Sequence, residues 1–217
     1  ASTSFTLAAI PELSAISLLQ TIGLGIVFGA LASLFCRAMH TGGTLYKKIE
    51  NPYLRIVVGG CIVVLLSLLV RSGNYNGAGM SVISAALAGH AVPWAFALKI
   101  VFTVLTLGAG FKGGEIVPCF FVGATCGCVV APLLGMDAGF GAALGLIAVF
   151  CGVTNSPMTS ILLGYELFGG QGLALLAMCA AVSYLLSGYS GLYREQKIIY
   201  SKTSPVFIGR KGGEEKQ

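Results

Sequence analysis

Long stretches of this chain contain no charged residue, and this pattern restricts its fold more than any other feature. Residues 138–165 form one such stretch, and charged side chains make up only 10% of the sequence against 56% hydrophobic residues. A soluble domain carries about 25% charged residues, so this chain has too few charges to cover a water-facing surface. Most of its exterior must face lipid, and the sequence therefore predicts an all-α polytopic membrane protein.

The charges that do occur divide the chain into predicted segments. Apolar runs predict membrane helices within residues 12–37, 56–70, 93–110, 119–134 and 171–188, and the third run contains one charge, Lys99. The second of these spans only about 22 Å at about 1.5 Å per residue, against a hydrocarbon core of about 30 Å, so it needs its flanks or shielding by protein. Residues 80–89 are too short to cross, and residues 40–55 are predicted to form a glycine-rich basic turn.

The uncharged run from residue 138 to residue 165 is interrupted by Asn155, Ser156 and Pro157. A proline preceded by serine is typical of the first turn of a new helix. We therefore expect two partial helices that join near the membrane interior or interface. Helices too short to cross, broken at glycine and proline, are typical of transporters that bind their substrate at discontinuous helices.

The most informative motif is Gly-Gly-Glu-Ile-Val-Pro, which ends at Pro118. Gly113 and Gly114 allow a sharp backbone turn, and Pro118 suits the first turn of a helix, where its missing N–H costs nothing. The N–H groups of Ile116 and Val117 would then point out of a helix N-terminus and, with the helix dipole, form an anion-binding site. A kink that serves only packing is the alternative interpretation.

Glu115, within the same motif, favours the functional interpretation. An ionisable side chain inside an apolar stretch is energetically expensive and is usually functional. We expect Glu115 to take up and release protons beside the anion, and a simple helix cap is the alternative. Lys99, one helix earlier, is predicted to pair with an acidic group or to extend toward the membrane surface, with contact to the anion as the alternative.

The net charge of +5 is concentrated in two basic clusters. One contains Lys47, Lys48 and Arg55, and the positive-inside rule predicts that both clusters are cytoplasmic. The second, C-terminal cluster contains Arg194, Lys197, Lys202, Arg210, Lys211 and Lys216. Aromatic residues do not interleave the basic ones, so we expect no nucleic-acid partner. The seven cysteines form no C-x-x-C pair, so we expect no metal site and no cofactor.

The motif residues resemble the CLC family of anion transporters. The Gly-Gly-Glu-Ile-Val-Pro run, followed by Gly123-Ala-Thr-Cys-Gly127, is similar to the CLC filter-helix motif. The short helix after Gly79 and the break at Asn155 extend the resemblance, which covers the whole chain as the C-terminal half of a CLC subunit. Chloride-type members carry Phe where this chain has Ile116, so the bacterial fluoride/proton antiporter branch is the nearer match.

The resemblance implies a CLC-like bundle of tilted, partly discontinuous helices. Residues 1–217 would form one transmembrane region, with a polar terminal segment and tail at residues 189–217. The backbone of residues 113–117 would contact the anion, Glu115 would couple its movement to protons, and Tyr200 would close the inner end of the pathway. An interfacial aromatic anchor is the alternative for Tyr200.

The resemblance also implies a function and partners. We expect part of a proton-coupled fluoride antiporter in the bacterial inner membrane, with fluoride or chloride, protons and lipid as partners and a homodimer in which Glu166 lies on the interface helix. A chloride channel or chloride/proton exchanger is the alternative, and a non-transporting scaffold or dimerisation module is the alternative of another class. An enzyme is not expected, because no nucleophile–base pair is evident.

The chain lacks features that a complete pathway of this family needs. No G-x-E-x-P stretch and no second candidate gate occur in it, and it begins at Ala1 without a methionine. We therefore expect a piece of a longer protein that does not transport by itself.

Overall fold

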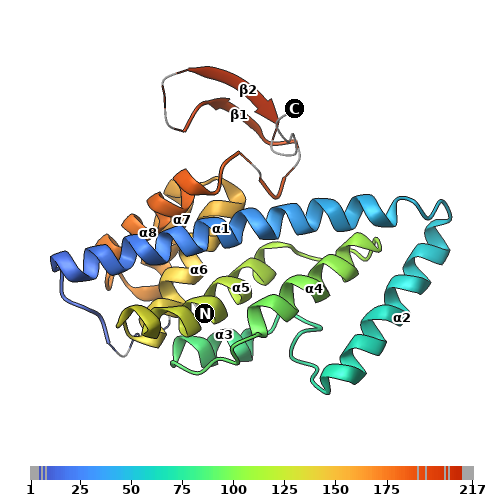
Figure 1. The fold of residues 1–217 in the computed structure, drawn as a ribbon, viewed down its shortest axis with the longest axis horizontal. Coiled ribbons are helices and arrows are strands. Elements are labelled where there is room, and N and C mark those ends of the chain that lie inside the picture. Colours follow the sequence, from blue (N-terminus) through green and yellow to red (C-terminus); the bar gives the residue numbers. More distant parts are fainter. Residues whose placement is uncertain are drawn as a thin grey trace.

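The structure is a computed structural model that describes residues 5, 7, 9–189, 191–193, 195–202, 204 and 206–211. Within this part the chain is mostly helical, as predicted (Figure 1). Its helices are α1 (Ala15–Tyr46), α2 (Pro52–Val70), α3 (Met80–Leu87), α4 (Ala95–Gly108), α5 (Ile116–Val130), the short 3-10 helix η1 (Ala131–Leu134), α6 (Ala138–Thr154), α7 (Pro157–Phe168) and α8 (Leu173–Leu186). Arg194 and Lys216, and the side chains of Arg210 and Lys211, lie outside the described residues.

Helix α1 begins with a capping box between Ser14 and Ser17 and runs along the whole bundle (Figure 1). The prediction of a turn over residues 40–55 is wrong in extent, because α1 continues to Tyr46 and α2 already begins at Pro52. The reason is tertiary packing. A Cβ on Gly42 would collide with the side chain of Val104, so this glycine allows α1 to lie directly against α4 instead of ending the helix.

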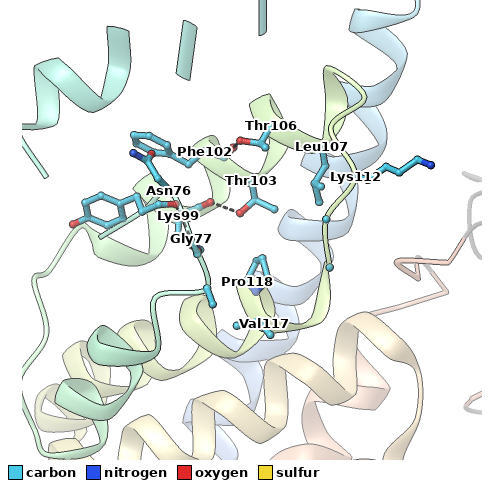
Figure 2. A pocket seen from close by; sticks show the side chains of 14 residues that line it. Asn76, Gly77, Lys99, Phe102, Thr103, Thr106, Leu107, Lys112, Val117 and Pro118 are labelled. Atoms are coloured by element: carbon cyan, nitrogen blue, oxygen red, sulfur yellow. Dashed lines mark hydrogen bonds between the residues drawn. The ribbon is translucent and has the colours of Figure 1, made fainter. Parts of the chain in front are cut away.

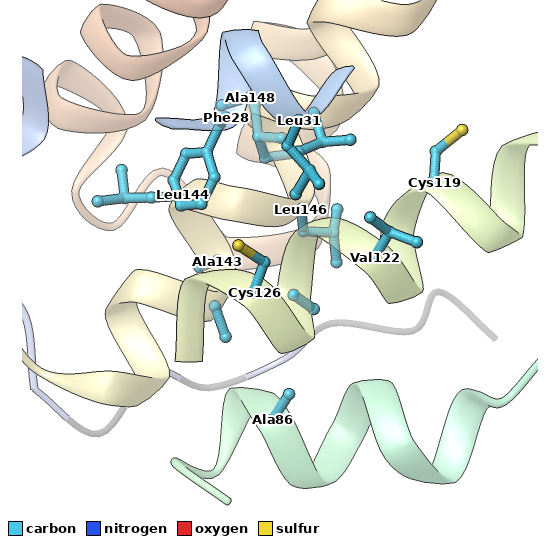
Figure 3. Close-up of a cluster of buried hydrophobic side chains, with 14 of the residues drawn as sticks. Phe28, Leu31, Ala86, Cys119, Val122, Cys126, Ala143, Leu144, Leu146 and Ala148 are labelled. Atoms are coloured by element: carbon cyan, nitrogen blue, oxygen red, sulfur yellow. The ribbon is translucent and has the colours of Figure 1, made fainter. Parts of the chain in front are cut away.

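The core lies between α5 and α6, whose backbones touch at glycine positions. A Cβ on Gly127 would collide with the carbonyl oxygen of Gly141 in α6, so the two helices pack without intervening side chains. Nearly all of α6 is buried. Phe28 and Leu31 of α1 belong to the same buried cluster as Leu144 and Leu146 of α6 (Figure 3).

The predicted break inside residues 138–165 is confirmed. Helix α6 ends at Thr154, Asn155 adopts the left-handed conformation with φ 53°, and α7 begins at Pro157. Asparagine is one of the few residues that adopts this conformation readily. Proline follows because its ring suits the first helical position. The local sequence therefore determines this boundary.

In the described part, three apolar helices are long enough to cross a membrane: α1, α2 and the continuous segment Ile116–Leu134. Helices α4, α6 and α8 are apolar but shorter. The short α6 agrees with the prediction, whereas residues 93–110 and 171–188 were predicted to span the membrane and form the shorter helices α4 and α8. Helix α2 contributes only Gly59 to the buried residues and stands at one edge of the bundle (Figure 1).

The polar segment after α8 contains a hairpin that the sequence analysis did not predict. Strands β1 (Lys197–Tyr200) and β2 (Phe207–Lys211) pair antiparallel, and the hairpin lies outside the helical bundle (Figure 1). Lys202 connects it to the end of α8, because its Nζ donates to the Tyr184 carbonyl oxygen at 2.6 Å and to Ser187 Oγ at 3.2 Å.

Candidate anion-binding site

The turn between α4 and α5 positions the predicted motif. Helix α4 ends at Gly108, and Gly110 then adopts φ 101°, a conformation that favours glycine. Helix α5 begins at Ile116, three residues earlier than predicted, which places Pro118 in its first turn. The first amides of a helix have no partner within it, so the N–H groups of Ile116 and Val117 are available at this end.

Glu115 occupies the N-cap position of α5, but its side chain makes no capping hydrogen bond. Glu115 therefore stands at the cap position without acting as a hydrogen-bonding cap. Its backbone carbonyl oxygen accepts a hydrogen bond from the Cys119 thiol at 3.0 Å.

A cavity of about 330 Å³ lies on one side of the turn. Gly113, Gly114 and Val117 form one wall, and the opposite wall comes from α4 and from the loop at Asn76 and Gly77 (Figure 2). A Cβ at Gly114 would meet nothing within 4 Å, so the peptide backbone here borders open space. Three of the predicted site residues therefore line one cavity, and two of them, Gly113 and Gly114, can do so only with their backbone.

Lys99 of α4 also lines this cavity, and its position differs from the prediction. The side chain is only 2% exposed, and Nζ donates to the carbonyl oxygens of Tyr75, at 3.1 Å, and Gly77. Nζ also lies 4.9 Å from the centre of the Phe121 ring. Within the described residues no carboxylate pairs with it. It therefore neither pairs with an acid nor extends to the membrane surface.

A second cavity of about 330 Å³ lies on the other side of the turn. Glu115 lines it together with His40 of α1 and Tyr193, and Leu107 borders both cavities. His40 Nε2 lies 2.9 Å from the carbonyl oxygen of Gly191. Because a carbonyl oxygen only accepts, Nε2 must carry a hydrogen there.

The remaining predicted residues, Ile116 and Tyr200, do not line either cavity. Ile116 is 37% exposed at the start of α5. Tyr200 is 66% exposed on the hairpin, where its ring packs edge-on against Phe207 with 6.2 Å between ring centres. Its role at the inner end of the pathway stays a prediction.

The sequence did not assign His40 to the site, and it gave contact with the anion only as the alternative for Lys99. No sequence motif contains His40, and only the packing of α1 against the turn brings this residue near Glu115. Lys99 did carry a signal, because it is a charge within an apolar helix. Sequence alone did not reveal that its amine would be enclosed beside the turn at residues 113–114.

Comparisons with known proteins agree with this architecture. The family described as voltage gated chloride channel matches residues 2–188. A chloride/fluoride channel protein of Pseudomonas syringae pv. tomato is 36% identical over 193 residues, which are 86% of this chain and 43% of that protein. A crystal structure of a CLC-type fluoride/proton antiporter is 34% identical with a TM-score of 0.81, over 85% of this chain and 47% of that one.

The chain thus spans about half the length of these relatives, which fits the prediction of one half of a subunit. The family match ends at residue 188, before the hairpin that carries Tyr200. The resemblance deduced from the motif around Glu115 is confirmed over the helical part. On this evidence the chain belongs to the voltage-gated chloride channel (CLC) family of integral membrane proteins.

Proposed function

We propose that this chain forms one wall of the ion pathway of a proton-coupled fluoride antiporter. The observation that carries the proposal is that neighbouring residues of a single turn border two different cavities. The backbone of Gly113 and Gly114 borders one cavity, while Glu115, the next residue, borders another. An anion and a proton can therefore be bound within one turn of chain.

The anion part of the proposal depends on backbone chemistry. The start of α5 offers N–H groups and the positive end of a helix dipole, which attract a small anion without a permanent counter-charge. A backbone site also excludes large side chains from the wall, and Gly114 has open space where a Cβ would be. Fluoride or chloride fits such a site.

The proton part depends on Glu115 and His40. Both line the second cavity, and Glu115 is not held by a capping hydrogen bond, so its carboxylate can change protonation without breaking the start of the helix. We propose that His40 supplies or receives the proton that Glu115 carries.

The surroundings of the pathway follow from the same proposal. In a bacterial inner membrane, the basic cluster of Lys47, Lys48 and Arg55, at the connection between α1 and α2, would face the cytoplasm, as would the C-terminal segment. Helix α7 exposes Met158 and Leu162 beside Glu166, and this surface supports a homodimer of the complete protein.

A chloride channel or chloride/proton exchanger is the second candidate. The relative from Pseudomonas syringae, whose name includes both chloride and fluoride, favours keeping it. A non-transporting scaffold is less well supported, because two cavities flank the turn at residues 113–117. An enzyme has no support from the named cavities, whose linings contain no nucleophile–base pair.

The test uses the complete subunit that contains this sequence, reconstituted in liposomes. A fluoride or chloride electrode records anion efflux, and a pH-sensitive dye records proton movement. We expect fluoride efflux to exceed chloride efflux and to drive protons in the opposite direction. In Glu115→Gln we expect proton movement to be lost. Equal proton movement in wild type and Glu115→Gln would contradict the role of Glu115, and faster chloride efflux would favour the second candidate.

A further inference from the structure

Lys99 is a buried cation for which the described residues provide no counter-charge. Its side chain is 2% exposed, and its ammonium contacts two carbonyl oxygens and the face of the Phe121 ring. Carbonyl dipoles and an aromatic ring attract a cation, but they do not cancel its charge. A buried charge without a partner of opposite sign is energetically expensive, so this arrangement favours an anion nearby.

The cavity beside Lys99 has room for such an anion. It measures about 330 Å³ and is bordered by Lys99 on one side and by the backbone of Gly113 and Gly114 on the other. The Thr103 and Thr106 hydroxyls also line it, but they donate to the carbonyl oxygens one turn earlier in α4, at 2.7 and 2.8 Å. The charged donor in this wall is therefore the ammonium of Lys99 (Figure 2).

We propose that this cavity is an anion-binding station in its own right, in which Lys99 supplies the positive charge that holds a small monovalent anion next to the turn at residues 113–114. The anion moves between this station and the amides of Ile116 and Val117. That the anion is fluoride or chloride rests on the proposed function, whereas its capture by Lys99 requires neither transport nor proton coupling.

Lys99 also joins α4 to the loop at Tyr75 and Gly77 through its hydrogen bonds. The test must therefore distinguish the effect of its charge on anion binding from the effect of these hydrogen bonds on the structure. The loop has other contacts, because the Tyr75 ring stacks on Phe102 with 5.7 Å between ring centres and meets Phe121 at 6.0 Å. Lys99→Gln keeps a hydrogen-bond donor and removes the charge, and Lys99→Arg keeps both.

Lys112 provides a matched control. It borders the same cavity and carries the same charge, but it is exposed, and its side chain points away from the other labelled residues (Figure 2). Solvent screens such a charge. If general surface charge attracts the anion, Lys112→Gln will weaken binding as much as Lys99→Gln does.

The experiment measures anion binding to the complete subunit that contains this sequence, solubilised in detergent. Sodium fluoride and sodium chloride are titrated while the amide NMR signals of Gly113 and Gly114 are recorded. We expect Lys99→Gln to bind at least about tenfold more weakly, Lys99→Arg to stay within about threefold of wild type, and Lys112→Gln to match wild type. Equal affinity of wild type and Lys99→Gln overturns the proposal, as does an equal loss in Lys112→Gln.

A second measurement keeps the proposal testable if Lys99→Gln does not fold. Crystals of the complete wild-type subunit are soaked in sodium bromide, and the anomalous signal of bromide is mapped. We expect a peak in the cavity next to Lys99 Nζ. A bromide peak only at the amides of Ile116 and Val117 would overturn the station at Lys99 while leaving the proposed function intact. Binding at Lys99 without proton coupling in the complete subunit would contradict only the proposed function.

Discussion

Gly123 of α5 and Gly145 of α6 pack back to back, so that a Cβ on either residue would collide with the backbone carbonyl of the other. This contact sets the distance between the two central helices. Because α5 begins at the turn that borders both cavities, it also sets where the predicted anion-binding amides lie. The packing of α5 on α6 is therefore part of the site.

The first prediction concerns this contact. We expect Gly145→Ala to lower the stability of the chain by about 1–3 kcal/mol, because the added methyl group overpacks the interface of two rigid backbones. Thermal unfolding in detergent, followed by circular dichroism, measures the effect. Gly164→Ala is the control, since its added Cβ would meet Ile147 at an ordinary 3.6 Å. An unchanged melting temperature in Gly145→Ala would show that the helices can separate freely.

The second prediction concerns the isolated chain. We expect the 217 residues alone to give no fluoride or chloride flux in liposomes above that of Glu115→Gln, because one wall of a pathway does not enclose an ion. An anion electrode records the efflux. Detergent is then added to release the remaining anion, which gives the total. Flux above this control would show that the chain forms a complete pathway by itself.

The third prediction separates His40 from the other histidine. In the complete subunit we expect His40→Gln to slow proton movement by about tenfold or more, as is typical for loss of a proton-transfer group, while the anion station at Lys99 still binds. His90→Gln is the matched control, because His90 is exposed and lines neither cavity. A pH-sensitive dye in liposomes records the protons. If both variants behave alike, His40 has no role in the transfer.

The fourth prediction concerns Lys202, which lies outside the membrane-spanning helices. Burial against the end of α8 lowers the pKa of its ammonium from 10.5 to about 8. Between these two values the folded state binds fewer protons than the unfolded state, so the contribution of Lys202 to stability increases as the pH rises from about 8 to 10.5. Lys202→Gln should remove this increase.

The measurement for Lys202 is the NMR titration of its side-chain 13Cε signal, assigned by comparison with Lys202→Arg. We expect a midpoint near pH 8. A midpoint near 10.5, the ordinary value, would mean that the hairpin does not enclose the amine at the end of α8.

Several elements could be predicted because they depend on neighbouring residues. Pro157 and the residues before it specify the break between α6 and α7, and the glycines before Glu115 specify the turn before α5. The end of α1 could not be predicted in this way. Gly42 breaks helices by its local preference, yet here its small size allows contact with Val104 and the helix continues.

By itself, the sequence determined that the chain enters a membrane, that its helices are partly discontinuous, and that Glu115 stands beside a helix N-terminus. The low charge content is a property of composition, and proline and glycine affect the helix ends close to them, so both can be interpreted without coordinates. Only the tertiary structure decided that Gly113 and Glu115 border different cavities, that His40 joins Glu115, and that Lys99 faces Gly113 across open space. These relationships join residues far apart in the chain, and they depend on how closely the helices can approach one another.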